Sequence, residues 1–517
     1  MRAIGADTVV TITAANPVAG TVRVSGDGSI VNTATLSDGV SNVPFYTDPT
    51  GSWNIASFIN SGTIGSSTLG GAALDLYDTA SITNTGTLIT NGDIFALNLT
   101  AYGSSTIDNS GTIVSGVNAR HDTSFAGDTL IPATLAMTNS GTITATHHAV
   151  VLSSYAGSAG GATVSLDNSG TIAASESGGT GVALYAVNYG AAADTRTAVT
   201  LTNSGTIRAN GGGTPLPDDP YAGAAPIYGS TPAFAVQTYA TSANRTQITN
   251  TASGAIEATG TLSTAIFSEG GLDLTNAGTI RGSNGTALAR NDYLSYYLGS
   301  DRLAGAIQTV GDADNRIVNT GTIIGSIALG GGNDRIENRG TMTGDVFLGA
   351  GDDIFLQQAN ATLTGTVDGG AGTDMLIVDA TAGGTINAAQ FVRFEGLSQT
   401  GQGNVNYLGS FGFDTIGLVG GTITVAAGDT LTTSGPVALT GSSADETVIN
   451  NGTILGTVAL GAGNDTFVEG PNSRVTGVVD GGAGDDLYSL VLAGTAVDHP
   501  GTAAVRPFDE RVVARAE

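Results

Sequence analysis

Short segments in which apolar and polar residues alternate make up most of the chain. Examples are ATLAMTNSGTITAT at 133–146 and TAVTLTNSGTIRAN at 197–210, both rich in Thr, Val, Leu and Ile. Alternation with a period of two predicts β-strands that bury one face. The segments between them lack helical periodicity, which argues against a βαβ sheet. We therefore expect an all-β protein.

One motif recurs within these segments: an apolar residue two positions before an Asn, and then Asn-x-Gly-Thr followed by Ile, Leu or Met. Copies begin at Asn60, Asn84, Asn109, Asn139, Asn168, Asn203, Asn276, Asn319, Asn338 and Asn450, with a degenerate copy at Asn250. From Asn60 to Asn338, successive copies are 19 to 47 residues apart. Such variation is typical of a solenoid whose coils carry loop insertions. Gly and Asn tolerate positive φ, so we interpret the motif as a corner between two strands.

Coiling the strands would place repeated residues above one another, because each strand then pairs with its equivalent in the next coil about 4.8 Å away. An apolar row is predicted from Ile64, Ile113, Ile143, Ile172, Ile207 and Ile280. The Asn residues would form a second row, hydrogen-bonded through their amides. That row could line a polar groove, but its ordinary role is to satisfy the backbone of the corners. The expected fold is a right-handed parallel β-helix that forms a single elongated body.

A second motif, [Leu/Gly]-Gly-x-Gly-x-Asp-x-apolar, joins the first from about residue 311. Its copies are LGGGNDRI (329–336), LGAGDDIF (348–355), GGAGTDML (369–376), LGAGNDTF (460–467) and GGAGDDLY (481–488). Their spacing places these loops on one edge of successive coils, so that each coil carries both kinds of corner. We divide the chain into N-terminal coils at 1–310, coils with added Gly-Asp corners at 311–490, and a disordered or truncated tail at 491–517.

Two insertions interrupt the repeats. The stretch 211–234 is rich in Pro and contains Tyr221 and Tyr228, which predicts a loop that leaves the coil. The stretch 289–305 adds three tyrosines and two arginines, and its spacing allows a short helix. Tyr and Arg are enriched at recognition surfaces, so both insertions are candidate contact sites for a ligand on a host or bacterial surface. The alternative is that they are tolerated insertions without a role.

Composition narrows the function. The chain has 517 residues, 78 glycines, no cysteine and a net charge of -27, and all its basic residues are arginines. Nucleic acid is an unsuitable partner, because phosphate contacts need clustered positive charge. A chain without lysine has neither a phosphate-binding loop nor Schiff-base chemistry. The absence of cysteine fits a protein that is exported through an oxidising compartment.

The N-[ST]-G-T-I repeats and the LGAGND and GGAGDD coils resemble the passenger region of type V autotransporters, over about residues 20–490. The resemblance implies a secreted β-helix that an outer-membrane barrel domain carries to the cell surface, often for adhesion or cell aggregation. We therefore expect a non-catalytic, surface-displayed protein. The first twenty residues lack the apolar stretch of a signal peptide, so we expect the leader and the barrel domain to lie outside this chain.

The Gly-Asp corners also resemble the calcium-binding repeats of RTX proteins, in which carboxylates and carbonyls of stacked loops surround the cation. The residues at the aspartate position are Asp334, Asp353, Asp374, Asp465 and Asp486. A calcium-dependent secreted repeat protein is thus one alternative, with calcium as the only cofactor considered. In the other interpretation, each Asp caps a tight Gly turn. RTX repeats recur every nine residues, whereas these recur once per coil.

A carbohydrate-active β-helix enzyme, either a polysaccharide lyase or a hydrolase, is the second alternative. Such an enzyme would need carboxylates converging with Arg on an exposed strand face. Asp352 with Asp353, and Asp485 with Asp486, are adjacent acids but lie in turns. His147 and His148 adjoin on a strand, so we expect their side chains on opposite faces, unable to share a metal. We assign no catalytic residues.

Overall fold

The computed structural model describes residues 2–3, 8–13, 21–23, 25–26, 28–42, 55–92, 94–123, 133–157, 161–175, 179–189, 197–210, 233–240, 245–260, 263–282, 305–492, 504–506 and 510–515. These residues belong to two compact units. The first unit comprises 1–317 and 321–330, and the second comprises 318–320 and 331–517. The strand β32 (Arg316–Asn319) spans the boundary.

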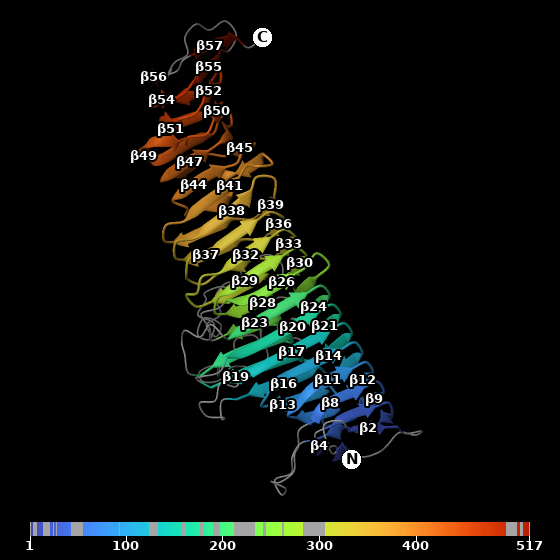
Figure 1. Cartoon of the computed structure of the whole chain (residues 1–517). Coiled ribbons are helices and arrows are strands. Elements are labelled where there is room, and N and C mark those ends of the chain that lie inside the picture. Colours follow the sequence, from blue (N-terminus) through green and yellow to red (C-terminus); the bar gives the residue numbers. More distant parts are fainter. Residues whose placement is uncertain are drawn as a thin grey trace, which may run out of the picture. The chain divides into compact units, whose positions relative to one another are not determined.

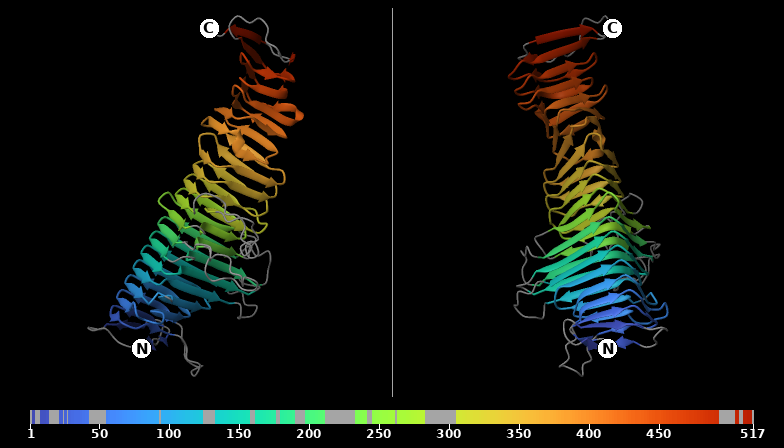
Figure 2. Two further views of the ribbon diagram at one scale, coloured as in Figure 1. Left: turned by 180° about the vertical axis from the view of Figure 1, so that it is seen from behind. Right: turned by 45° about the vertical axis from the view of Figure 1, so that its right-hand side comes forward.

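A coil of the first unit consists of three short strands, each of which belongs to a different sheet. In one such coil these are β8 (Ile55–Asn60), β9 (Thr63–Gly65) and β10 (Leu74–Tyr77), which we assign to sheets A, B and C. The next coil begins with β11 (Thr79–Asn84), which pairs in parallel with β8. Figures 1 and 2 show the strands of each sheet stacked edge to edge through this unit. Strands that pair only with their equivalents in neighbouring coils define a parallel β-helix, as predicted.

The remaining strands of the first unit extend these three sheets. Sheet A also contains β2 (Val9–Ile12), β5 (Ser29–Asn32), β14 (Ser105–Asn109), β17 (Ala133–Asn139), β20 (Ala162–Asn168), β23 (Ala198–Asn203), β26 (Thr246–Asn250) and β29 (Leu272–Asn276). Sheet B also contains β6 (Thr35–Leu36), β12 (Thr87–Ile89), β15 (Thr112–Val114), β18 (Thr142–Ala145), β21 (Thr171–Ala174), β24 (Thr206–Asn210), β27 (Ala255–Thr259), β30 (Thr279–Arg281) and β33 (Thr322–Ile324). Sheet C also contains β3 (Val22–Arg23), β7 (Val40–Ser41), β13 (Leu97–Ala101), β16 (Val117–Asp122), β19 (His148–Ala156), β22 (Thr180–Asn188), β25 (Ala233–Ala240), β28 (Ser263–Glu269), β31 (Ile307–Val310) and β34 (Ile327–Ala328). The short strands β1 (Arg2–Ala3) and β4 (Ser25–Gly26) pair separately.

The isoleucine row predicted from the repeats is confirmed in sheet B. Ile113 is in register with Ile143, and Ile143 with Ile172. The row also includes Leu88 and Ile256, which occupy the same position in their coils, and all these side chains are fully buried. An uninterrupted apolar column of this kind removes one large side chain per coil from water, which stabilises each coil through its neighbours.

The glycine of the Asn-x-Gly-Thr motif is required for a reason different from the predicted one. Gly111, Gly141 and Gly170 are not among the described glycines with positive φ. A Cβ atom on Gly141 would instead meet the carbonyl oxygen of Gly111, and one on Gly170 would meet that of Gly141. The corner therefore needs glycine because consecutive coils approach one another closely, and not because of a left-handed backbone.

The second unit continues the same construction with additional strands. They are β35 (Arg335–Asn338), β36 (Thr341–Thr343), β37 (Val346–Ala350), β38 (Ile354–Gln358), β39 (Thr362–Thr364), β40 (Val367–Ala371), β41 (Met375–Asp379), β42 (Gly384–Asn387), β43 (Phe391–Val392), β44 (Gly396–Thr400), β45 (Asn404–Leu408), β46 (Phe411–Phe413), β47 (Thr415–Val419), β48 (Gly421–Val425), β49 (Thr430–Thr440), β50 (Glu446–Asn450), β51 (Thr453–Ala459), β52 (Thr466–Glu469), β53 (Arg474–Val475), β54 (Val478–Asp480), β55 (Leu487–Leu492), β56 (Ala504–Arg506) and β57 (Glu510–Arg515). The strands β42, β45, β48, β50, β52, β55 and β57 form a further parallel sheet. Among the described residues the only helical element is the turn η1 (Ala388–Gln390), and no helix there is long and apolar enough to cross a bilayer.

The Gly-Asp corners at 329–336, 348–355 and 369–376 lie where sheet C leads into sheet A, whereas those at 460–467 and 481–488 lie where the sheet A strands β51 and β54 lead into the further parallel sheet. The strands β37 and β40 pair so that Gly349 faces Gly370 and Ala350 faces Ala371. Here the glycines do adopt positive φ, with values of 117° at Gly349 and 110° at Gly370. Within the segment 491–517, where we expected a disordered or truncated tail, β56 pairs with β54 and β57 pairs with β55.

Candidate functional site

The Asn residues of the repeat form a continuous amide column inside the corner between sheets A and B. Asn109 Nδ2 donates to Asn139 Oδ1 at 2.7 Å, and Asn139 Nδ2 donates to Asn168 Oδ1 at 2.7 Å. Equivalent bonds of 2.7 to 2.9 Å link the column from Asn32 to Asn276. Each Asn of this column is at most 1% exposed. The column is therefore structural, as expected, because it offers no surface to a ligand.

The five candidate aspartates are buried at corners of the second unit: Asp334, Asp353 and Asp374 lie between sheets C and A, and Asp465 and Asp486 lie between sheet A and the further parallel sheet. Asp353 accepts the backbone N–H of Asp334 at 2.7 Å, and Asp374 accepts that of Asp353 at 2.8 Å. Further along the unit, Asp465 accepts the N–H of Glu446, and Asp486 accepts that of Asp465. We call these groups the carboxylate columns. Four of the aspartates, Asp353, Asp374, Asp465 and Asp486, each cap the corner of the preceding coil, whereas the sequence suggested that each Asp caps its own turn.

The carboxylate columns hold acids close together in a dry environment. The second oxygens of Asp374, Asp465 and Glu446 are buried without a hydrogen-bond partner. Burial raises the pKa of Asp374, and the nearby charge of Glu395 raises it further. Burial, together with the nearby carboxylates of Glu446 and Asp486, raises the pKa of Asp465 to about 7. Asp465 is therefore partly protonated near neutral pH.

The described acidic side chains form neither a metal-binding cluster nor a catalytic pair of carboxylates. Throughout the described residues, no three His, Cys, Asp or Glu side chains come together in a way that could hold a metal ion. The adjacent acids also separate, because Asp353 and Asp486 are buried while Asp352 and Asp485 are exposed. Consecutive residues in these corners thus point to opposite sides of the backbone, and the two acids of a pair do not act together.

The outer face of sheet C, over β10, β13 and β16, carries a polar ladder that sequence reasoning missed. Asn98 Nδ2 donates to Asp75 Oδ1 at 2.8 Å, and Asn118 Nδ2 donates to Asn98 Oδ1 at 2.9 Å. In the next coils the equivalent positions are Val151 and Ala183, which have no hydrogen-bonding side chain. The ladder therefore ends at Asn118, because its Oδ1 faces a coil without a side-chain donor.

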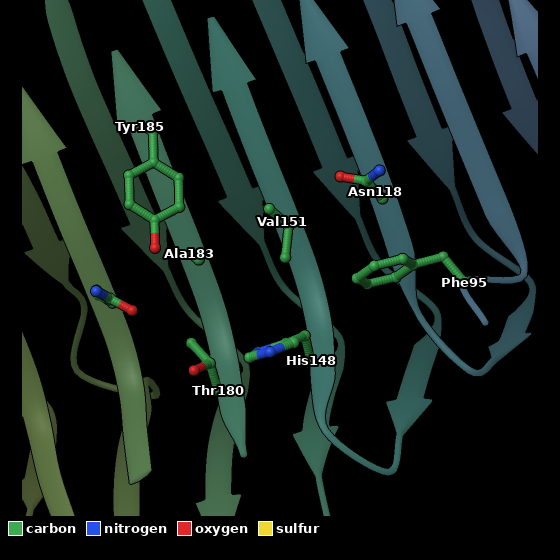
Figure 3. A pocket seen from close by; sticks show the side chains of 8 residues that line it. Phe95, Asn118, His148, Val151, Thr180, Ala183 and Tyr185 are labelled. Carbon is green, nitrogen blue, oxygen red and sulfur yellow. The ribbon is translucent and has the colours of Figure 1, made fainter. Parts of the chain in front are cut away.

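A pocket of about 290 Å³ opens where the polar ladder ends. Its lining residues are Phe95, Asn118, His148, Val151, Thr180, Ala183, Tyr185 and Gln237. In Figure 3 the Tyr185 hydroxyl points toward His148 and Thr180, and Phe95 lies on the other side of His148. Since Val151 and Ala183 are small, they form a low floor between larger neighbours. The pocket thus combines an apolar floor with polar groups at its rim.

The titratable groups of the pocket are uncharged near neutral pH. The pKa of His148 is lowered by desolvation of its ring and by the charge of His147. Burial, and next the charge of Glu269, raises the pKa of Tyr185 to about 12, so that its hydroxyl remains a donor. A second pocket, of about 230 Å³, is lined by both His147 and His148. The prediction that these two side chains lie on opposite faces is therefore wrong, because His147 belongs to the corner that precedes β19.

An aromatic stack lies beyond the pocket at the far end of the same strands. The guanidinium of Arg120 lies 4.8 Å from the centre of the Tyr155 ring and forms an ion pair of 2.6 Å with Asp122. The rings of Tyr155 and Tyr189 stack with centres 6.1 Å apart and an angle of 12° between their planes. Tyr189 is 66% exposed. Tyrosines near the ends of successive sheet C strands were the sequence signal that could have revealed this face.

The predicted contact insertions fall almost entirely outside the described residues. Only 233–234 and Gly305 of the stretches 211–234 and 289–305 are described. The strands that flank them are β24 and β25 for the first, and β30 and β31 for the second. The strands that flank each insertion therefore belong to sheets B and C, and the two pairs of strands are two coils apart.

Comparison with known proteins gave no match. No family model matches the chain, and no curated protein or solved structure is significantly similar to it. The resemblance to autotransporter passengers thus depends on the repeat motifs and on the parallel β-helix alone.

Proposed function

We propose that the chain is a surface-displayed passenger of the autotransporter type, which serves in adhesion or cell aggregation and does not catalyse a reaction. The observation that carries the proposal is the amide column, which joins coil to coil from Asn32 to Asn276. A solenoid held together by nearest-neighbour contacts can fold from one end as it emerges from a membrane. Such a scaffold suits export followed by display.

The composition supports export, and the insertions support contact with a partner. The chain has no cysteine, so oxidation cannot crosslink it before it folds. The insertions at 211–234 and 289–305 each connect a strand of sheet B to a strand of sheet C, and we propose that both contact a partner. In this proposal the passenger works with an outer-membrane barrel domain, and its ligand belongs to a host or bacterial surface.

Surface display is tested on intact cells of the source organism. We expect added protease to remove the chain from washed cells without lysing them, and deletion of its gene to reduce clumping and attachment. A cytosolic enzyme assayed in the same samples provides the control for cell integrity. Recovery of the chain only from the protease-protected, soluble cell fraction would contradict display.

A polysaccharide lyase or hydrolase is a second candidate, because Arg120 and Asp122 lie together beside Tyr155 on the sheet C face. In the structure these two residues neutralise one another in an ion pair, which leaves neither free as an acid or base. We therefore expect no new reducing ends or unsaturated products when polysaccharides are incubated with the purified chain. Product formation that is lost in Asp122→Asn would favour the enzyme.

A further inference from the structure

We propose that the outer face of sheet C binds a neutral glycan chain, with one sugar in the pocket between Asn118 and Tyr185 and a neighbouring sugar on the exposed ring of Tyr189. This inference names a ligand class for the proposed adhesion and depends on that function for its biological role. The binding itself is a property of the purified chain. It involves described residues only, so the insertions are not needed for the argument.

The pocket has the size and chemistry of a sugar-binding site. Its volume of about 290 Å³ is close to the lower limit for small-molecule pockets, which suits a single sugar ring better than a larger cofactor. Sugar hydroxyls both donate and accept hydrogen bonds. The rim offers matching groups, which are the Oδ1 of Asn118, the hydroxyls of Thr180 and Tyr185, and the amide of Gln237.

The charge of the site selects a neutral ligand. None of the eight lining residues is Asp, Glu, Arg or Lys. Arg120, which lies two residues beyond Asn118 on β16, is already paired with Asp122. An anionic glycan would therefore gain no free positive partner, and the chain's net charge of -27 would repel it. A cationic ligand would find no carboxylate within the pocket. Hydroxyl-rich neutral sugars avoid both penalties.

The aromatic stack supplies the second half of the site. The flat C–H face of a sugar ring packs on an aromatic ring, whose face carries partial negative charge. Tyr189 is fixed from behind by Tyr155, and Tyr155 in turn by Arg120, so little side-chain entropy is lost on binding. Tyr185 and Val187 follow one another along β22, and Tyr189 lies directly beyond its end. The four residue-to-residue steps from Tyr185 to Tyr189 span about 13 Å of extended chain, which accommodates consecutive sugars.

Binding is tested by calorimetry on the full chain with neutral oligosaccharides: tetramers of β-1,4-glucose, β-1,3-glucose and β-1,4-mannose. Oligogalacturonate serves as the acidic comparator and chitosan oligomers as the basic one. We expect at least one neutral tetramer to bind, and to be recovered uncleaved, with neither charged comparator binding more tightly. Absence of binding by every neutral tetramer at millimolar concentration, or tighter binding of a charged comparator, would overturn the proposal.

Variants locate the site on the sheet C face. Tyr189→Ala should weaken binding about tenfold, whereas Tyr189→Phe, which keeps the ring, should retain most of the affinity. Asn118→Leu should also weaken binding, because the amide at the rim is lost. The matched control is Tyr102→Ala, since Tyr102 is an exposed tyrosine near sheet C that belongs to another aromatic pair.

The control variant should lose less than about twofold in affinity, and all four variants should keep the unfolding temperature of the parent chain. Equal losses in Tyr189→Ala and Tyr102→Ala would overturn the placement of the site. Failure of glycan binding together with protease accessibility on intact cells would reject this inference and leave display in place. Glycan binding by the purified chain, together with protection of the chain from protease on intact cells, would reject display and leave the glycan site in place.

Discussion

The second unit has amide bonds of its own, from Asn319 through Asn338 to Gln357, but it also contains carboxylate columns whose chemistry is opposite to that of the amide column. In the first unit, every Asn of the amide column both donates and accepts, so the column is neutral and satisfied along its length. In the carboxylate columns of the second unit, Asp374 and Asp465 only accept, and each keeps one buried oxygen without a partner. The same stacking of coils thus produces one column that is indifferent to pH and another whose stability depends on bound protons.

The largest effect should come from placing a charge in the amide column. Asn139→Asp removes the donor to Asn168 and places a buried carboxylate between two amides, which should cost about 3 to 5 kcal/mol. The loss of stability is measured by thermal unfolding, with hydrogen exchange used to monitor the first unit. The control Ser140→Asp adds the same charge at the adjacent exposed position and should change little. Equal stability of the two variants would disprove the role of the column.

A methyl group at the same corner should have the next largest effect. Gly141→Ala places a Cβ atom against the carbonyl of Gly111, and the coils must move apart to relieve the clash, at a cost of about 1 to 3 kcal/mol. Gly103→Ala is the matched control, because a Cβ atom there would meet nothing within 4 Å. Chemical denaturation of both variants compares them directly. A control that is destabilised as much as Gly141→Ala would contradict the close-approach explanation.

Opposite responses to pH should distinguish the two units. Burial lowers the pKa of His121 to about 4, so the unfolded state binds more protons between about pH 6.5 and 4, and the first unit loses stability as pH falls through that range. The pKa of Asp465 is raised to about 7, so the folded state binds more protons between about pH 4 and 7. The second unit therefore loses stability as pH rises through that range.

Hydrogen exchange at pH 5 and pH 8, corrected for the intrinsic exchange rate, resolves the two units because their peptides are separable. We expect the second unit to be better protected at pH 5 and the first unit at pH 8. His121→Leu should flatten the response of the first unit without altering that of the second. Parallel responses in both units would show that general surface charge controls the stability, and not these two buried groups.

Neutralising one buried carboxylate should stabilise the second unit at high pH, by a smaller amount than the preceding effects. Asp465→Asn keeps an oxygen that accepts the N–H of Glu446 and removes a buried charge, so at pH 8 it should stabilise the second unit by about 1 kcal/mol. The matched variant Asp485→Asn removes a charge from an exposed position in the equivalent corner of the next coil. Denaturant midpoints at pH 8 compare the two. A destabilised Asp465→Asn would show that the charged form is the one the fold requires.

Calcium should have the smallest effect. Since no three acidic side chains converge among the described residues, we expect calcium or a chelator to leave the unfolding temperature of both units within experimental error at constant ionic strength. Differential scanning calorimetry with calcium and with magnesium provides the comparison. A rise confined to the second unit, and specific to calcium, would instead place a cation in the carboxylate columns and support the RTX-like alternative.

The repeats made the fold predictable from the sequence, whereas the pocket on the outer face of sheet C could not be predicted. Ile143 and Asn139 recur at a fixed place in a motif, so equivalent residues had to stack once the strands coiled. The residues of the pocket belong to no motif, because the lengths of the insertions place Asn118 and Tyr185 at irregular intervals along the chain. Only the strand register aligns them. The burial of Asp374 was equally hidden, since a turn residue gives no sequence signal of which side it faces.

The glycines that touch across successive corners also determine how the protein can change in length. Gly111, Gly141 and Gly170 present the same atoms to the coil before and to the coil after. An in-frame duplication of residues 139–167 would therefore create junctions that already exist in the molecule, whereas a single side chain added at one of these glycines would not fit. Evolution of this chain is thus open to the gain or loss of whole coils and closed to gradual change at the corner.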